Sequence, residues 1–359
     1  MGSQPTTESA PPRPALPLPP ASTRVDGAWQ WGRYRAPFRK PDVGATLAKR
    51  FRLKEWHYVS LDTERLFLAF GLVQLGYVGN AFLYLVDKKQ PTVAKEYTAL
   101  SLLGRHLDFA ESSVGGETRW KRRDAEIRVS WRGPRPESGA FRGAPAPELA
   151  SPPGAWEVRL DLMLGEEHVR GGFRARAAEG LALLHDLGDA RPAYTHKAAG
   201  LEARGSLRVG EEAIDLAGGL AVSDWTRSLA ARETRWKWAS FAGRAGGHSL
   251  GLNLSAEVYD DANGDSLENA LWVDGRVQPL GGVEFDVPPI PGVEDWHIRS
   301  REGDEVDLVF RPLGARAQHL DMKVLQSDFV QPYGTFHGHV AGHRVDDLFG
   351  VVEDHLSVW

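Results

Sequence analysis

Hydrophobic and polar residues alternate in twos over most of the chain beyond about residue 50. The stretch FRLKEWHYVSLD is typical, because it places Val59 and Leu61 on one side of an extended strand and Trp56 and Tyr58 on the other. The same period recurs in GYVGNAFLYLVD, AEIRVSW, WEVRLDLML, GSLRVG, SLGLNLSAEV and DEVDLVFRP. This pattern predicts an all-β protein.

Turn residues separate the alternating runs. GRAGG (243–247) joins two of them, and Asp274-Gly275 favours a type I′ hairpin. Strands adjacent in sequence are therefore expected to pair antiparallel, which argues against a parallel α/β fold. Helical pattern is confined to two short segments, 223–233 and 181–185, which we expect to form short helices.

Length and low-complexity segments suggest how the chain is divided. A chain of 359 residues favours about two domains. The proline-rich segment 1–22 predicts a disordered tail, and the Pro-, Gly- and Ala-rich segment 132–154 predicts a surface loop. With a boundary near Ala190, we expect an N-terminal domain over 23–190 and a C-terminal domain over 191–359, each a meandering barrel or a sandwich.

Composition excludes several classes of protein. Hydrophobic residues make up 42% and charged residues 25%, which is typical of a globular protein with a sizeable core. Forty-three Lys and Arg against 48 Asp and Glu give a net charge of −5 with no basic block, so nucleic acid is not an expected partner. The absence of cysteine removes disulfides, thiolate zinc sites and a cysteine nucleophile.

Targeting and cofactor signals are also missing from the sequence. No apolar run reaches the roughly 18 residues of a membrane-spanning helix, and the N-terminus does not have the pattern of a signal peptide, so we expect a cytoplasmic protein without a transmembrane segment. The sequence has no Walker loop, no dinucleotide-binding glycine motif and no nucleophile elbow with a credible triad. We therefore expect no cofactor, and the sequence leaves the oligomeric state open.

An ordered set of motifs carries a family resemblance. YTHKAAGLEARGSLRVG, ETRWKWASFAGR, SLGLNLSAEV, ENALWVDGR, DWHIRS, DLVFRP and QPYGTFHG follow one another after WHYVSLDTERLFLAFGLVQLGYVGNAFLYLVD. With these motifs the chain closely resembles the bacterial family called domain of unknown function 2804. More distantly, Asp224 followed by a Trp-x-Trp strand and a Gly-rich hairpin resembles the carotenoid hydratases. That resemblance implies two lipocalin-like (calycin-type) β-barrel domains and an apolar ligand such as a terpenoid or polyketide.

The candidate catalytic acid lies in SDWTRSLAARETRWKWASF. If Trp225, Trp236 and Trp238 surround Asp224, desolvation raises the pKa of that carboxyl and lets it protonate an alkene or enol near neutral pH. Two alternatives stay open. Arg227 could pair with Asp224 and hold it ionised, or Asp224 could be the N-cap of a short helix.

Aromatic residues at two-residue spacing form the candidate ligand wall. Trp236 and Trp238 share one face of a strand and could stack a flat apolar ligand or fill a barrel interior. Trp56 and Tyr58 on an early strand have the same two interpretations.

Polar residues near these aromatics complete the candidate site. Lys197 could anchor an anionic group, while His196 could act as a base or be a structural side chain. Asn253 either faces solvent or orients a ligand inside the barrel, Asn269 is a further candidate ligand-binding residue, and Glu268 could be a second carboxyl beside Asp224.

Two histidine-containing segments are expected to be structural. His337 and His339 share a strand face without further ligands, so we expect no metal site. The C-terminal EDHLSVW is expected to close a barrel with its charges exposed.

Together these residues predict a protein that binds a hydrophobic small molecule and carries out cofactor-free hydration or isomerisation. The alternatives are a non-catalytic carrier with the same cavity and a protein-interaction scaffold with filled barrels.

Overall fold

The computed structural model describes residues 13–46, 49, 51–133, 154–189, 191–322 and 325–358. Their regular structure consists of β-strands, with no α-helix in these ranges, and this confirms the predicted all-β class. Residues 1–12 of the predicted tail and most of the predicted loop, 134–153, lie outside the described residues. Residues 13–22 are in contact with the body, because Leu16 is buried and the carbonyl of Pro17 accepts a hydrogen bond from the backbone of Arg35.

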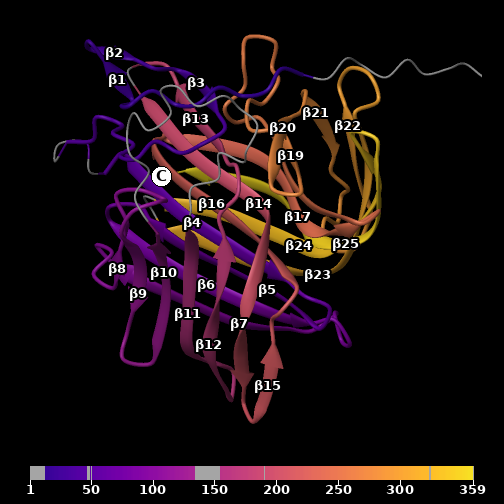
Figure 1. The fold of residues 1–359 in the computed structure, drawn as a ribbon. Helices are drawn as coiled ribbons and strands as arrows, with labels where there is room; N and C mark the ends of the chain where they lie inside the picture. The colour runs from indigo at the N-terminus through magenta and orange to yellow at the C-terminus, as the bar shows by residue number, and fades with distance from the viewer. Residues whose placement is uncertain are drawn as a thin grey trace, which may run out of the picture.

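The larger sheet has fourteen strands and is a nearly closed barrel (Figure 1). Its main path runs β7-β6-β5-β4-β16-β14-β12-β11-β10-β9-β8, and β13, β15 and β3 pair off this path. The strands are β3 (Gly32–Tyr34), β4 (Leu53–Asp62), β5 (Leu66–Gln74), β6 (Val78–Asp87), β7 (Ala94–Leu102), β8 (Leu107–Asp108), β9 (Glu117–Lys121), β10 (Ala125–Arg132), β11 (Ala155–Leu164), β12 (Glu167–Arg176), β13 (Leu181–Asp186), β14 (Pro192–Val209), β15 (Glu212–Asp215) and β16 (Gly219–Leu229).

The second sheet has nine strands in the order β20-β19-β18-β17-β25-β24-β23-β22-β21 and is a half-barrel. Its strands are β17 (Glu233–Ala245), β18 (His248–Ala256), β19 (Ala270–Val273), β20 (Arg276–Pro279), β21 (Val283–Asp286), β22 (Trp296–Ser300), β23 (Val306–Met322), β24 (Leu325–Val340) and β25 (His343–Val358). β1 (Arg24–Val25) and β2 (Ala28–Trp29) form a separate small ribbon. The predicted turns are confirmed: Asp274 and Gly275, both with positive φ, join β19 to β20.

The two predicted short helices are wrong. Residues 223–229 belong to β16, which pairs with β14 and β4, and residues 181–185 belong to β13. Both strands are buried along nearly their whole length. A strand covered on both faces loses the two-residue alternation, so its sequence cannot be distinguished from a helix by periodicity.

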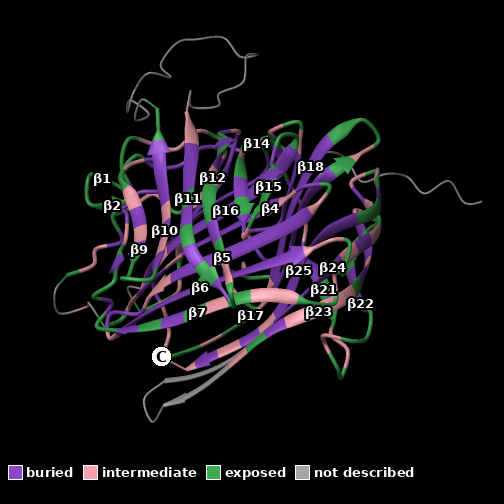
Figure 2. Ribbon diagram, turned by 90° about the horizontal axis from the view of Figure 1, so that it is seen from below, coloured by how far each residue is buried: buried purple, intermediate pink, exposed green. Residues whose placement is uncertain are grey.

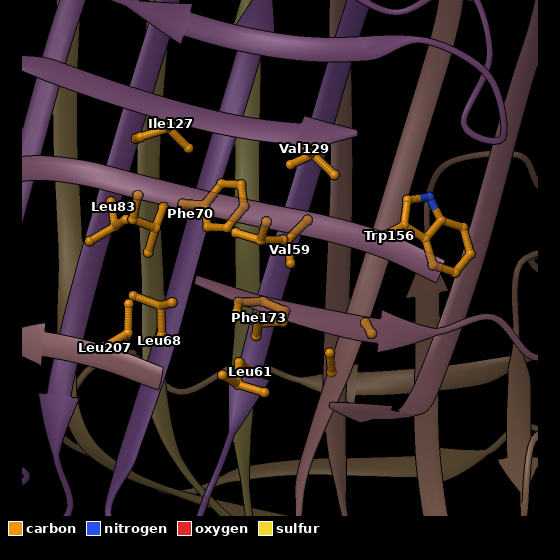
Figure 3. Close-up of a cluster of buried hydrophobic side chains, with 14 of the residues drawn as sticks. Val59, Leu61, Leu68, Phe70, Leu83, Ile127, Val129, Trp156, Phe173 and Leu207 are labelled. Atoms are coloured by element: carbon orange, nitrogen blue, oxygen red, sulfur yellow. The ribbon is translucent and has the colours of Figure 1, made fainter. Parts of the chain in front are cut away.

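Apolar side chains fill the concave interiors of both sheets. In the first sheet, Val59, Leu61 and Phe70 face side chains such as Val129 and Phe173 across the barrel (Figure 3). In the second, a separate cluster centred on β17, β18, β22 and β23 includes Phe241, Leu252, Trp296 and Phe310.

The convex face of β4, β5 and β6 packs against the second sheet. Aromatic pairs cross this contact, with ring centroids 5.1 Å apart for Tyr58 and Trp238 and 4.9 Å apart for Phe67 and Phe349. Consequently β4, β5 and β16 are buried along most of their length (Figure 2). The chain passes from the first sheet to the second between β16 and β17, while the division into two domains stays a prediction.

The backbones of the two sheets approach closely where β14 meets β18. The register of β14 shifts between Ala198 and Leu201, and Gly200 there has a φ of +69°. A Cβ added at Gly251 of β18 would fall well inside van der Waals distance of the backbone of Ala199 and Gly200. The absence of a side chain at Gly251 therefore allows this contact.

We predict that Gly251→Ala destabilises the protein by about 1–3 kcal/mol, because the added methyl group must displace backbone. Gly243→Ala on the adjacent strand is the control, since the atoms nearest to its Cβ would belong to the side chain of Leu348, the closest at 2.8 Å, and not to the backbone. Chemical denaturation measures both. Equal stabilities of the two variants would contradict the proposed tight contact.

Candidate functional site

A cavity of about 170 Å³ lies between the two sheets. Trp56, Tyr58 and Phe82 line it from the first sheet, and Trp236 and Trp238 line it from the second. The predicted wall of Trp236 and Trp238 therefore lies at the contact between the two sheets and not in the interior of a barrel. The predicted pairing of Trp236 and Trp238 on one face is confirmed by their shared exposure to this cavity.

Strand register brings the polar end of the cavity together. Lys197 of β14 pairs with Asp224 of β16, which pairs with Tyr58 of β4, so the three side chains share one face of the sheet. The row continues to Gly71 and Phe82. Because Gly71 has no side chain, the ring of Phe82 occupies the space over its backbone.

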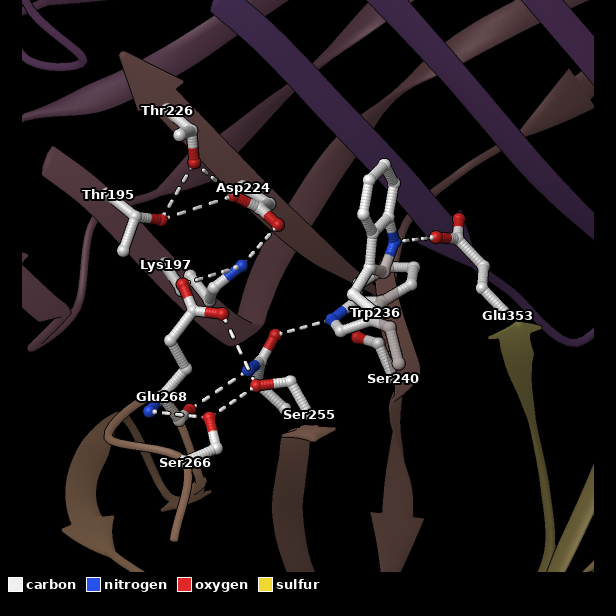
Figure 4. A network of polar contacts seen from close by, with 12 residues as sticks. Thr195, Lys197, Asp224, Thr226, Trp236, Ser240, Ser255, Ser266, Glu268 and Glu353 are labelled. Carbon is white, nitrogen blue, oxygen red and sulfur yellow. Dashed lines mark hydrogen bonds and ion pairs between the residues drawn. The ribbon is translucent and has the colours of Figure 1, made fainter. Parts of the chain in front are cut away.

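Lys197, Asp224 and Glu268 form a buried cluster at one end of the cavity (Figure 4). The ammonium of Lys197 donates to Asp224 and lies 3.3 Å from Oε1 of Glu268. The side chains are at most 8% exposed. Asp224 also accepts from Thr226 at 3.3 Å and, at the limit of a hydrogen bond, from Thr195 at 3.5 Å. Asp224 therefore acts as an acceptor for several donors.

Burial and charge act in opposite directions within this cluster. Burial lowers the pKa of Lys197, but Asp224 and Glu268 outweigh it, so that the net shift is upward and the ammonium is retained. Burial raises the pKa of Glu268 to about 7. The positive charge of Lys197 lowers this pKa, and the negative charge of Asp224 raises it further. Glu268 can thus exchange a proton near neutral pH.

Glu353 of β25 is a second buried carboxyl on the cavity. Its Oε2 accepts from the indole N–H of Trp236 at 2.9 Å, and its Oε1 accepts from the side-chain amide of Gln331 at 2.5 Å. Burial raises the pKa of Glu353 to about 7, and the two hydrogen bonds only partly counter this effect. A carboxyl group available for proton transfer therefore lies at the side of Trp236.

The sequence interpretation missed Glu353, and the expectation that EDHLSVW exposes its charges is wrong for Glu353 and His355, both 7% exposed. The alternation of polar Glu353, His355 and Ser357 with Val352 and Leu356 was the available signal. This alternation indicated a polar strand face. The face is buried because the first sheet packs over it, which the sequence of this strand alone does not show.

The two predicted asparagines are both buried, and neither faces solvent. Asn253 accepts from the indole N–H of Trp238 at 2.7 Å and donates to the carbonyl of Glu268 at 2.9 Å, so it links the tryptophan wall to the acidic cluster. Asn269 instead accepts from the backbone N–H of Ser255 and donates to the carbonyl of Gly281. Its bonds are structural.

Trp225 and His196 point away from the cavity. They lie on the opposite face from Asp224 and Lys197 because side chains alternate along a strand. Trp225 packs with Tyr194 and Phe38, and His196 is hydrogen-bonded to Ser113 at 2.8 Å. Of the alternatives for His196, the structure shows a buried, structurally bonded side chain.

Both alternatives for Asp224 are resolved. Arg227 does not pair with it but with Glu55, at 2.8 Å. Asp224 also caps no helix, because it lies in the middle of β16.

The described part of the chain holds no group of three or more His, Cys, Asp or Glu side chains placed to bind a metal. Within that part, no helical segment has the length and apolarity needed for membrane crossing.

Fold and site together define an all-β protein with an aromatic-walled, acid-lined cavity between two sheets. The chain belongs to the family called domain of unknown function 2804, whose model matches residues 23–359, and the predicted family membership is confirmed. None of the curated proteins matches the chain.

Solved structures that are similar to the chain include the following three. A protein assigned as an AttH from Nitrosomonas europaea is 15% identical with a TM-score of 0.42, covering 94% of this chain and 99% of that one. Kievitone hydratase from Nectria haematococca is 10% identical with a TM-score of 0.43, covering 96% and 98%. CghA is 10% identical with a TM-score of 0.40, covering 85% and 87%. At identities of 10–15% and TM-scores of 0.40–0.43, none of these structures indicates what this chain binds or catalyses.

We predict that Lys197→Met destabilises the protein by about 3–5 kcal/mol, because it leaves two carboxyl groups buried without their cation. The double variant Lys197→Met/Asp224→Asn should recover part of this loss. Chemical denaturation of both variants measures this recovery, and a single variant as stable as the wild type would contradict a buried ion cluster.

We also predict that Glu353 makes the stability of the folded protein depend on pH. The pKa of Glu353 is about 7 in the folded protein, whereas its ordinary value is 4.5. Between these two pH values the carboxyl group is protonated in the folded state and ionised in the unfolded chain. Stability should therefore fall as pH rises from about 4.5 to about 7 and level off above, by on the order of 3 kcal/mol for this group.

Glu353→Gln, which imitates the protonated acid, should show a smaller fall. Denaturation of both proteins at about pH 5 and about pH 8 tests this. Because Glu268 is present in both, its contribution cancels, and parallel pH profiles would show that Glu353 titrates normally.

Proposed function

We propose that the protein binds an apolar small molecule in the cavity between the sheets and carries out cofactor-free proton transfer on it, in the form of hydration or isomerisation of a carbon–carbon double bond. The observation that carries the proposal is that two carboxyl groups with a pKa of about 7, Glu268 and Glu353, line one aromatic cavity. An acid or base works best when its pKa lies near the operating pH.

The cavity walls support binding of a flat apolar group. Its lining includes indole rings from both sheets and the rings of Tyr58, Phe82 and Phe329. A volume of about 170 Å³ is close to that of cavities known to hold a single aromatic ring. Aromatic faces also stabilise a neighbouring cation, which matters if protonation of an alkene leaves positive charge on carbon.

We assign proton donation to Glu353 instead of Asp224. Asp224 accepts from Lys197 and Thr226, so its part is to hold the lysine in place. In the proposed step the carboxyl proton of Glu353 moves to one alkene carbon, and the cation forms on the other. The cation then either binds water, whose released proton goes to the carboxylate of Glu268, or loses an adjacent proton to that group. The first route adds water, and the second moves the double bond.

We predict that Glu353→Gln lowers turnover by at least about 100-fold, the usual range for loss of a general acid, while binding is largely retained. The substrate would come from native mass spectrometry of protein purified from its own host, which identifies a copurifying metabolite. Incubation in deuterated water then reports a gain of water or of deuterium in that molecule.

Glu284→Gln, which changes an exposed carboxyl on β21, is the matched control and should behave as the wild type. A bound metabolite that the wild type leaves chemically unchanged would support a carrier and contradict catalysis. Full activity of Glu353→Gln would contradict the assignment of the acid.

A further inference from the structure

Arg316 of β23 is a buried cation on the cavity that the proposed chemistry does not use. It is 1% exposed and is one of the residues lining the cavity. It lies opposite Gln331 in the strand register, and Gln331 is the residue that donates to Glu353. Arg316 therefore belongs to the part of the cavity next to the proposed acid.

The guanidinium of Arg316 is only partly hydrogen-bonded. Its Nη2 donates to Gln318 at 2.8 Å and to Thr98 at 3.3 Å. Its Nε and Nη1 have no hydrogen-bond partner among the described residues. Among the described side chains, the nearest carboxylate is that of Glu96, 4.0 Å from Nε and itself 38% exposed.

Aromatic rings hold this guanidinium in position. Its central carbon lies 4.2 Å from the ring centroid of Phe82 and 5.1 Å from that of Phe329. Both rings also line the cavity. The guanidinium therefore packs against two rings of the cavity wall, and two of its donor atoms are buried there without a hydrogen-bond partner among the described residues.

A buried charge without full partners is costly, and a bound anion removes that cost. The carboxyl groups that line the cavity already have partners of their own. Asp224 and Glu268 lie against the ammonium of Lys197, and Glu353 accepts hydrogen bonds from Trp236 and Gln331. None of them is hydrogen-bonded to Arg316.

We propose that the ligand of this cavity is a small carboxylic acid, whose carboxylate binds the free donors of Arg316 while its apolar body lies against the aromatic walls. This inference rests on the proposed function and names its substrate class. Arginine is suited to a planar carboxylate because its donors form a fork that matches two oxygens. A doubly charged phosphate is less well matched, since Lys197 is already held by two carboxylates and Glu96 lies nearby.

The probes are 3-phenylpropanoate and its neutral isostere 3-phenylpropanamide, with affinities measured near neutral pH by calorimetry. We expect the wild type to bind the carboxylate about tenfold or more tightly than the amide, as a charge-assisted hydrogen bond provides. In Arg316→Met this preference should disappear while amide affinity stays within about threefold. Arg311→Met, which changes an exposed arginine on the same strand, should keep the wild-type preference.

Arg316→Lys provides a second variant if Arg316→Met does not fold, and its single charge without a fork should leave a reduced preference. Equal binding of both probes by the wild type, or an unchanged preference in the Arg316 variants, would overturn the carboxylate assignment and leave ligand binding in the cavity intact. Failure of the wild type to bind either probe would count against the proposed function itself, and the inference would fall with it.

Discussion

Exclusion of water from the face shared by β14, β16 and β4 is the constraint on which the site depends. The second sheet covers this face, so each polar group on it must find a partner within the protein or pay for its desolvation. Lys197 meets this demand by lying between Asp224 and Glu268. The same burial raises the pKa of Glu268, in this cluster, and of Glu353, on β25 of the second sheet, to about 7.

Hydrogen bonds from the second sheet fix the orientation of the aromatic wall. The indole N–H groups of Trp236 and Trp238 are both satisfied, by Glu353 and by Asn253, which fixes how the two rings lie in the cavity wall. Asn253 in turn binds the backbone at Glu268. A shift of Trp236 would therefore disturb the carboxyl group of Glu353, and a shift of Trp238 would disturb Asn253 and, through it, the backbone at Glu268.

Much of the fold could be predicted from the sequence, because most strands are covered on one face and keep the two-residue alternation. β16 and β13 were mistaken for helices since both of their faces are buried. Within the site, Asp224, Lys197, Trp236 and Trp238 could be found because they are close in sequence or unusual in chemistry. Glu353 and Arg316 could not, since their importance arises only when β23 and β25 meet the first sheet. Trp225 was wrongly included for a related reason, as sequence proximity to Asp224 does not say which face of the strand a side chain occupies.

Both barrel interiors are filled with apolar side chains, and the cavity lies outside them, at the seam between the sheets. The residues that shape the cavity therefore contribute little to either core. Exchanges at positions such as Val73 or Leu100 can alter which molecules fit without dismantling the scaffold. An architecture of this kind separates evolutionary change in specificity from the maintenance of the fold, so members of one family can diverge in the molecules they accept while keeping the same two sheets.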